Sequence, residues 1–170
     1  NPGFDGVLCL PGSHGKWARV SAGEVVGSAG ALTGEVFAAL CEHTVLRHVT
    51  APHAAAARWD AAAFAEGVAE GRAAADKLLA RLFALRAEGL LGRRTPDAAR
   101  AWLSGLLIGA ELAALRGYWL GQNLAVLGAA PLAARYAAAL SAQGATPVEA
   151  DGEAMALRGL VAARARLAPG

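Results

Sequence analysis

The sequence has few cysteines and few aromatic residues, and these shortages exclude several classes of protein. Its 170 residues include only 2 cysteines, Cys9 and Cys41, which stand far apart. Because zinc sites and redox motifs bring cysteines together in close pairs, neither is indicated, and a disulfide scaffold is excluded. We expect both to be small buried hydrophobes in a reduced compartment. Aromatic residues make up 6% of the chain, and none is interleaved with the densest basic spots, Arg93–Arg94 and residues 158–166, which argues against a nucleic-acid surface.

Charge of one sign and long apolar segments are also lacking. Lys and Arg number 16 and Asp and Glu 14, and the two signs are mixed as on solvated helix faces. The longest uncharged run, residues 117–134, is interrupted by Gln122, Asn123 and Pro131, and a membrane span needs about 20 apolar residues. The opening residues do not resemble a signal peptide. We therefore expect a cytoplasmic protein without a membrane segment.

The first residues of the chain predict a series of short strands. A chain of this length is typical of one domain with a real core. Residues 7–10 form a buried apolar run, residues 16–20 alternate polar and apolar, and residues 24–26 predict a third strand. The dense turn cluster at 11–15 separates the first two strands.

Helical periodicity dominates the middle of the chain. Thr33 is expected to cap a helix that reaches residue 46, and residues 50–59 are expected to form a loop. The apolar stripe over 64–85 predicts one long helix, which we consider able to pack on another lobe or a second subunit. A further helix over 96–117 begins with a proline at its first position.

Strands and helices alternate in the remaining residues. Residues 124–128 predict a strand, 131–143 a helix, 146–149 an edge strand, and 152–167 a last helix capped by Asp151. Such alternation implies parallel strands with crossover helices. The expected fold class is therefore α/β, with a small mixed sheet that starts with a β-hairpin.

Two turns could bind parts of a ligand. Gly12, Ser13, His14 and Lys16 combine a tight turn, whose backbone N–H groups are exposed, with a hydroxyl and a lysine, which suits a phosphate. The motif of a P-loop is absent, and an ordinary hairpin turn remains the alternative. Gly128–Ala129 follows a strand, where small residues let a flat ring approach the backbone, although a compact turn would look the same.

Three further polar features surround the middle helices. The helix start at Thr33 and Gly34 offers free N–H groups to an anion, although plain capping explains it as well. Glu111 lies within the apolar run 106–112, so its charge is either paired or functional, and Glu35 is a second candidate for a polar site. The histidines have no spacing that favours a metal site, so no metal ligands are predicted.

Taken together, several segments resemble the 2-dehydro-3-deoxygalactonokinase family. Residues 10–17 (LPGSHGKW) are similar to the family's LPGTHxKW, residues 32–46 to its MTGEL…HSxL segment, and residues 103–111 (LSGLLIGAE) to its LSGLLIGAE. Residues 134–136 and 151–153 also stand where the family has comparable segments. The resemblance covers nearly the whole chain, but only the second part of the family protein.

This resemblance implies a fold and an activity. The family belongs to the actin-like ATPase superfamily, so residues 1–170 would form one ribonuclease-H-like, C-terminal nucleotide-side lobe with a large helical insertion. The implied reaction transfers the γ-phosphate of ATP, with Mg²⁺, to the 6-hydroxyl of 2-dehydro-3-deoxygalactonate. The hairpin from Gly12 to Lys16 would face the β- and γ-phosphates, together with Thr33 and Gly34, and Gly128–Ala129 would contact the adenosine.

The chain departs from the family pattern in two ways. Ser13 stands where threonine is usual and Gly15 where a small side chain is usual, and both changes preserve the hydroxyl or backbone donor at position 13. The superfamily's D-x-G motif is absent. We therefore expect the first phosphate loop, the catalytic base and most of the sugar site in an N-terminal lobe.

Partners and a rival function follow from that departure. We expect the N-terminal lobe to be a partner, a second copy of the chain to be a candidate partner, and this chain alone not to turn over. The rival interpretation is a non-catalytic actin-like module that binds nucleotide or oligomerises.

Overall fold

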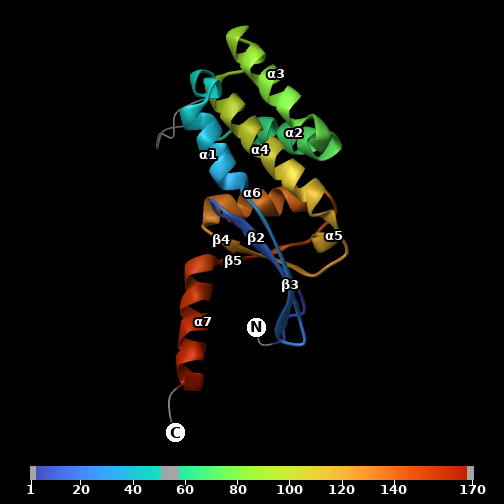
Figure 1. The fold of residues 1–170 in the computed structure, drawn as a ribbon, viewed down its shortest axis with the longest axis vertical. Coiled ribbons are helices and arrows are strands. Elements are labelled where there is room, and N and C mark those ends of the chain that lie inside the picture. Colours follow the sequence, from blue (N-terminus) through green and yellow to red (C-terminus); the bar gives the residue numbers. More distant parts are fainter. Residues whose placement is uncertain (1–2, 51–57, 168–170) are drawn as a thin grey trace. The chain divides into compact units, whose positions relative to one another are not determined.

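The computed structural model describes residues 3–50 and 58–167 (Figure 1). The chain forms two compact units, one of residues 1–30 with 118–170 and one of residues 31–117. Most of the loop predicted over 50–59 lies outside the described residues. No helix in the described ranges combines the length and the apolar character that crossing a membrane requires.

The first unit is built on a mixed five-stranded sheet in the order β3-β2-β1-β4-β5. β1 pairs antiparallel with β2 and parallel with β4, and β4 pairs parallel with β5. The predicted α/β class, the hairpin start and the edge position of the last strand are therefore confirmed. The strands are β1 (Gly6–Leu10), β2 (Gly15–Ser21), β3 (Glu24–Ala31), β4 (Leu124–Gly128) and β5 (Val148–Asp151).

The core of this unit lies at the centre of the sheet. Cys9 of β1 pairs with Trp17 on one side and with Val126 on the other, and all three are at most 1% exposed. From Val7 to Leu10 of β1, buried positions alternate with more exposed ones, which matches the two-residue period of a strand. Within the described residues, Cys9 and Cys41 are buried and form no disulfide, and burial raises the pKa of the Cys41 thiol, which suits the predicted role as inert hydrophobes.

Two helices follow the parallel strands. α6 (Ala130–Ser141) buries residues three and four apart, such as Ala133, Tyr136 and Leu140, and runs along the sheet in Figure 1. α7 (Gly152–Leu167) extends beyond β5 and buries no residue. Its N-cap is Asp151, whose Oδ1 accepts a hydrogen bond from the Ala154 N–H at 2.7 Å. The predicted cap is confirmed.

The second unit is helical. It contains α1 (Thr33–His43), the 3-10 helix η1 (Val45–His48), α2 (Ala61–Ala73), the 3-10 helix η2 (Ala75–Lys77), α3 (Leu78–Leu90) and α4 (Pro96–Ala114). The short helix α5 (Arg116–Trp119) follows α4. α4 is the central element, with Ile108 and most of its neighbours buried. As predicted, it begins with a proline, and the Thr95 hydroxyl accepts from the Ala98 N–H at 3.2 Å.

The single long helix predicted over 64–85 is wrong, because the structure has two helices there. α2 ends at Ala73, and Ala74 leaves the helical region with φ −145° and ψ 54°. Neither glycine nor proline marks this break. Since alanine is the best helix former, packing around α4 rather than local propensity interrupts the helix. The first helix is also shorter than predicted, because Thr44 is extended and caps η1 instead.

Arg94 links three helices of this unit. Its guanidinium donates to both carboxylate oxygens of Glu66 at 3.0 and 2.9 Å and to Glu88 at 3.0 Å. It also lies 5.2 Å from the centre of the Trp102 ring. Since the Arg94 side chain is 13% exposed, the network is partly shielded from water. These charge-assisted bonds hold the pKa of Glu66 below its usual range.

Arg94→Ala is therefore expected to lower the unfolding free energy at pH 7 by about 2 kcal/mol, a value reduced because Glu66 is half exposed. Because the folded pKa of Glu66 is depressed, this stabilisation is present above the unfolded pKa of about 4.3 and is lost as the pH falls through the folded pKa. Urea unfolding between pH 7 and pH 3 measures this loss. The neighbouring exposed residue provides the control Arg93→Ala, and equal losses for the two variants would contradict the prediction.

Candidate nucleotide-binding edge of the sheet

Two of the predicted ligand-binding turns meet at one edge of the sheet. β1, β4 and β5 are parallel, so their carboxyl ends lie on the same side. The hairpin turn begins with Pro11 after β1, and the strand-to-helix turn begins at the end of β4. A Cβ on Gly128 would lie 3.1 Å from Pro11 Cγ, so the two turns are in close contact. The structure thus brings together residue groups that were predicted separately.

The hairpin turn presents its polar side chains to solvent. Its two ends are fixed by the pairing of Leu10 with Lys16. Ser13, His14 and Lys16 are exposed, and Gly12 is partly exposed. Within the described residues, the side chains of Lys16 and Ser13 make no hydrogen bond or ion pair. A lysine ammonium with three free donors at the end of a hairpin is suited to an anion.

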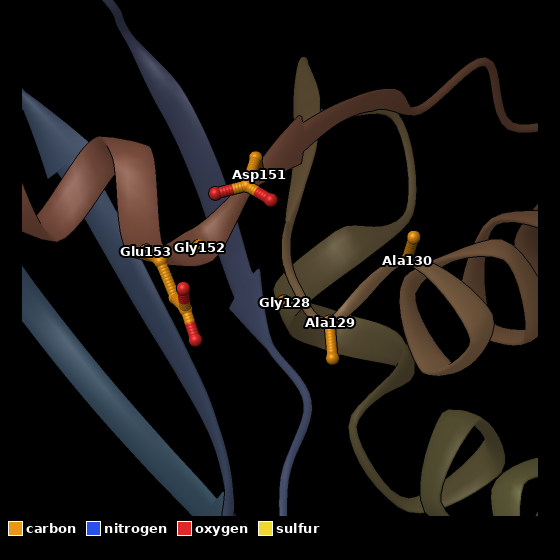
Figure 2. Close-up of a pocket in the computed structure, with 6 residues that line it drawn as sticks. All are labelled: Gly128, Ala129, Ala130, Asp151, Gly152 and Glu153. Atoms are coloured by element: carbon orange, nitrogen blue, oxygen red, sulfur yellow. The ribbon is translucent and has the colours of Figure 1, made fainter.

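A pocket of about 430 Å³ opens at the same edge, beside the ends of β4 and β5. Figure 2 shows the start of α6 on one side of it and the start of α7 on the other. The residues that line it are Gly128, Ala129, Ala130, Asp151, Gly152 and Glu153. Four of these have no side chain beyond Cβ, so much of the wall is backbone. Such a surface lets a flat ring approach closely.

The two strand-to-helix turns touch each other through their glycines. Gly128 pairs with Asp151 in the parallel register, and a Cβ on Gly152 would lie 3.1 Å from Gly128 Cα. The sequence predicted Gly128 and Ala129 as ligand-binding residues, and Asp151 as a helix cap. The predicted parallel strands were a usable signal for Asp151 as well, because parallel pairing places the carboxyl end of the last strand beside Gly128.

In the helical unit, Thr33 and Glu111 are hydrogen-bonded to each other. The Thr33 hydroxyl donates to Glu111 Oε2 at 2.5 Å, and Glu111 is 5% exposed. The prediction that Thr33 caps α1 is wrong, because the N-cap position is Leu32 and no side chain caps this helix. Thr33 is already the first residue of the helix, one position after the N-cap, and its hydroxyl donates to the buried carboxylate. Glu111 is thus paired, which was one of the two roles expected for it.

This pairing limits what Thr33 can offer a ligand. A hydroxyl has one proton, and donation to Glu111 leaves only acceptor capacity on the oxygen. A phosphate at this position would therefore be bound through backbone N–H groups of Thr33 and Gly34 in the first turn of α1. Glu35 lies exposed in the same turn. In the described part of the chain, no three His, Cys, Asp or Glu residues gather as a metal site would require.

Comparison with known proteins identifies the family. The family model of 2-keto-3-deoxy-galactonokinase matches residues 1–163. The chain belongs to this family. The resemblance carried by the sequence segments is therefore confirmed.

Two curated relatives show how much of a family member the chain represents. "Probable 2-dehydro-3-deoxygalactonokinase DgoK1" of Rhizobium meliloti (strain 1021) is 35% identical over 164 residues, which is 96% of this chain and 53% of the relative. The 2-dehydro-3-deoxygalactonokinase of Escherichia coli (strain K12) is 31% identical over 139 residues, which is 81% of this chain and 46% of the relative. The chain spans about half the length of these relatives.

A solved structure also matches this chain over about half of its own length. The crystal structure of a Sinorhizobium meliloti protein with the same kinase name has a TM-score of 0.89 and 32% sequence identity to this chain. The similarity covers 100% of this chain and 56% of the other. The mixed sheet with its helices is therefore a fold that this family member shares.

Proposed function

We propose that this chain is the nucleotide-side part of an ATP-dependent sugar-acid kinase. The reaction transfers the γ-phosphate of ATP to the 6-hydroxyl of 2-dehydro-3-deoxygalactonate. One observation carries the proposal: an exposed hairpin turn, whose lysine side chain has no partner among the described residues, and a backbone-lined pocket lie side by side at the carboxyl edge of one sheet. Family membership supports the choice of reaction.

Charge determines how the nucleotide lies along this edge. The pocket has carboxylates from Asp151 and Glu153, whereas the hairpin has the ammonium of Lys16. Because like charges repel, phosphates are disfavoured in the pocket and favoured at the hairpin. The nucleoside therefore occupies the pocket against Gly128 and Ala129, and the phosphates extend toward the hairpin.

The chemical contribution of this chain is positioning and charge stabilisation. Phosphoryl transfer depends mainly on holding the reacting groups in line and on neutralising the phosphate oxygens. Lys16 and the backbone N–H groups near Gly12 and Ser13 serve the second purpose. The hairpin, residues 11–16, contains no carboxylate, so it is not by itself a Mg²⁺ site. Mg²⁺ would arrive on the phosphates of ATP, with the catalytic base outside this chain.

The fold assignment is part of the same proposal. We infer that the first unit is a ribonuclease-H-like lobe of the actin-like ATPase type. The antiparallel opening hairpin, the parallel later strands and the strand order support this assignment. Residues 31–117 are then a helical insertion between β3 and β4.

The test is ATP turnover in a fusion protein. Residues 1–170 replace the matching half of the Rhizobium meliloti relative, and ADP release is followed with the sugar acid as substrate. We expect a saturable rate from the fusion and none from the 170-residue chain or from the relative's other half alone. A fusion that binds ADP but never turns over would overturn the kinase proposal in favour of a non-catalytic nucleotide-binding module.

A further inference from the structure

Of the six residues that line the pocket between the starts of α6 and α7, only Asp151 and Glu153 have polar side chains, and both are carboxylates. Glycines and alanines form the rest of its lining, as Figure 2 shows. One carboxylate is already used, because Asp151 Oδ1 accepts the capping hydrogen bond from the Ala154 N–H. The chemistry left for a ligand therefore rests largely on Glu153.

Glu153 has no partner within the described residues. Its side chain is exposed, and it forms no hydrogen bond or ion pair there. It projects from the first turn of α7, whereas Ala129 and Ala130 form the opposite side of the pocket (Figure 2). An ionised carboxylate accepts hydrogen bonds and donates none. The Glu153 carboxylate therefore favours a ligand group that donates hydrogen bonds.

The nucleoside half of a nucleotide offers such donors in its sugar. The flat base belongs against the backbone of Gly128 and Ala129, where side chains are smallest. With the base there, a ribose turned toward α7 meets Glu153, which lines that side of the pocket. The two neighbouring ribose hydroxyls are paired donors, and a carboxylate has two oxygens to receive them.

We propose that Glu153 is a specificity-determining residue that accepts hydrogen bonds from the ribose hydroxyls, so that the pocket selects ribonucleotides over 2′-deoxyribonucleotides. This inference rests on the proposed function, because it assumes that the nucleoside occupies this pocket. It adds a preference within that function, which nucleotide binding alone does not require.

The experiment is a calorimetric titration with ADP, 2′-deoxyADP and IDP, performed on the 170-residue chain and on the fusion described above. Unmodified protein is expected to bind ADP about tenfold more tightly than 2′-deoxyADP. In Glu153→Ala the two affinities become equal, whereas Glu153→Gln, which retains one acceptor oxygen, preserves part of the ratio. The control Glu24→Ala removes the same charge from exposed β3 and leaves the ratio unchanged.

The ratio of affinities separates this role from a structural one. Glu153 lies at a helix N-terminus, where a carboxylate stabilises the helix, but that effect weakens both nucleotides alike. A tenfold ratio that persists in Glu153→Ala overturns the inference, and so does equal binding of ADP and 2′-deoxyADP by unmodified protein. If the variant instead loses discrimination between ADP and IDP, Glu153 contacts the base and the ribose assignment fails. Absence of ADP binding to both proteins overturns the proposed function itself.

Discussion

Gly105→Ala is expected to lower the unfolding free energy of the helical unit by about 3 kcal/mol. A Cβ at this position of α4 would lie 2.1 Å from the backbone oxygen of Phe64 and 2.9 Å from the Val68 nitrogen. These are backbone atoms of α2, so no side chain can rotate away, and the two helices must separate. The steric cost exceeds the gain of about 1 kcal/mol that alanine normally brings to a helix.

Thermal and urea unfolding followed by circular dichroism measures this effect. The matched control is Gly159→Ala in α7, where a Cβ meets nothing within 4 Å. That variant is expected to be as stable as the original or up to about 1 kcal/mol more stable. If Gly105→Ala unfolds at the same denaturant concentration as Gly159→Ala, the close approach of α2 and α4 is not as the structure shows it.

The same close approach explains what could not be predicted in the helical unit. Gly67 and Gly71 of α2 lie against the backbone of α4, and Gly105 and Gly109 of α4 lie against that of α2. A Cβ at any of the four would lie 2.1–2.3 Å from the opposite backbone. In a sequence, such glycines only weaken a helical pattern and do not show which helix lies against them. The apolar stripe over 64–85 alone therefore predicted one long helix, although tertiary packing divides it at Ala74.

The elements with strong local signals were predictable. The alternation over residues 16–20 has the two-residue period of a half-buried strand, and the short apolar runs at 7–10 and 124–128 are typical of buried strands. Thr95 and the proline after it marked the start of α4 because both signals act within one helical turn. Thr33 looked like the same kind of signal. Its partner Glu111 is 78 residues away, so no local pattern could show that its hydroxyl is engaged.

The candidate site, too, was predictable from the sequence only in part. The hairpin at Gly12–Lys16 and the turn at Gly128–Ala129 could be singled out from their residue types, but their proximity depends on the strand order β1-β4-β5. Asp151 was predicted as a helix cap, and it is one. The parallel pairing makes the same turn a wall of the pocket, so one short segment has two roles.

Lys16 of the hairpin is expected to be needed for phosphoryl transfer. In the fusion protein, Lys16→Ala is expected to lower kcat about 100-fold, because it removes a positive donor from oxygens whose charge is redistributed during transfer. KM for ATP should rise as well. The Lys16 side chain makes no hydrogen bond or ion pair with the described residues, so its removal leaves no buried partner unsatisfied and should not alter stability.

Lys77 provides the matched control, because it is the only other lysine of the chain and is also exposed. It belongs to η2 in the helical unit, and Lys77→Ala should leave both kinetic constants unchanged. Lys16→Arg keeps the charge and should retain part of the rate.

Steady-state kinetics at two salt concentrations provide a second test. Salt screens a charge that is exposed to solvent, so high salt should reduce the difference in KM for ATP between Lys16→Ala and the original protein. If Lys16→Ala and Lys77→Ala behave alike, the phosphates do not lie at the hairpin, and the orientation proposed for the nucleotide must be reversed or abandoned.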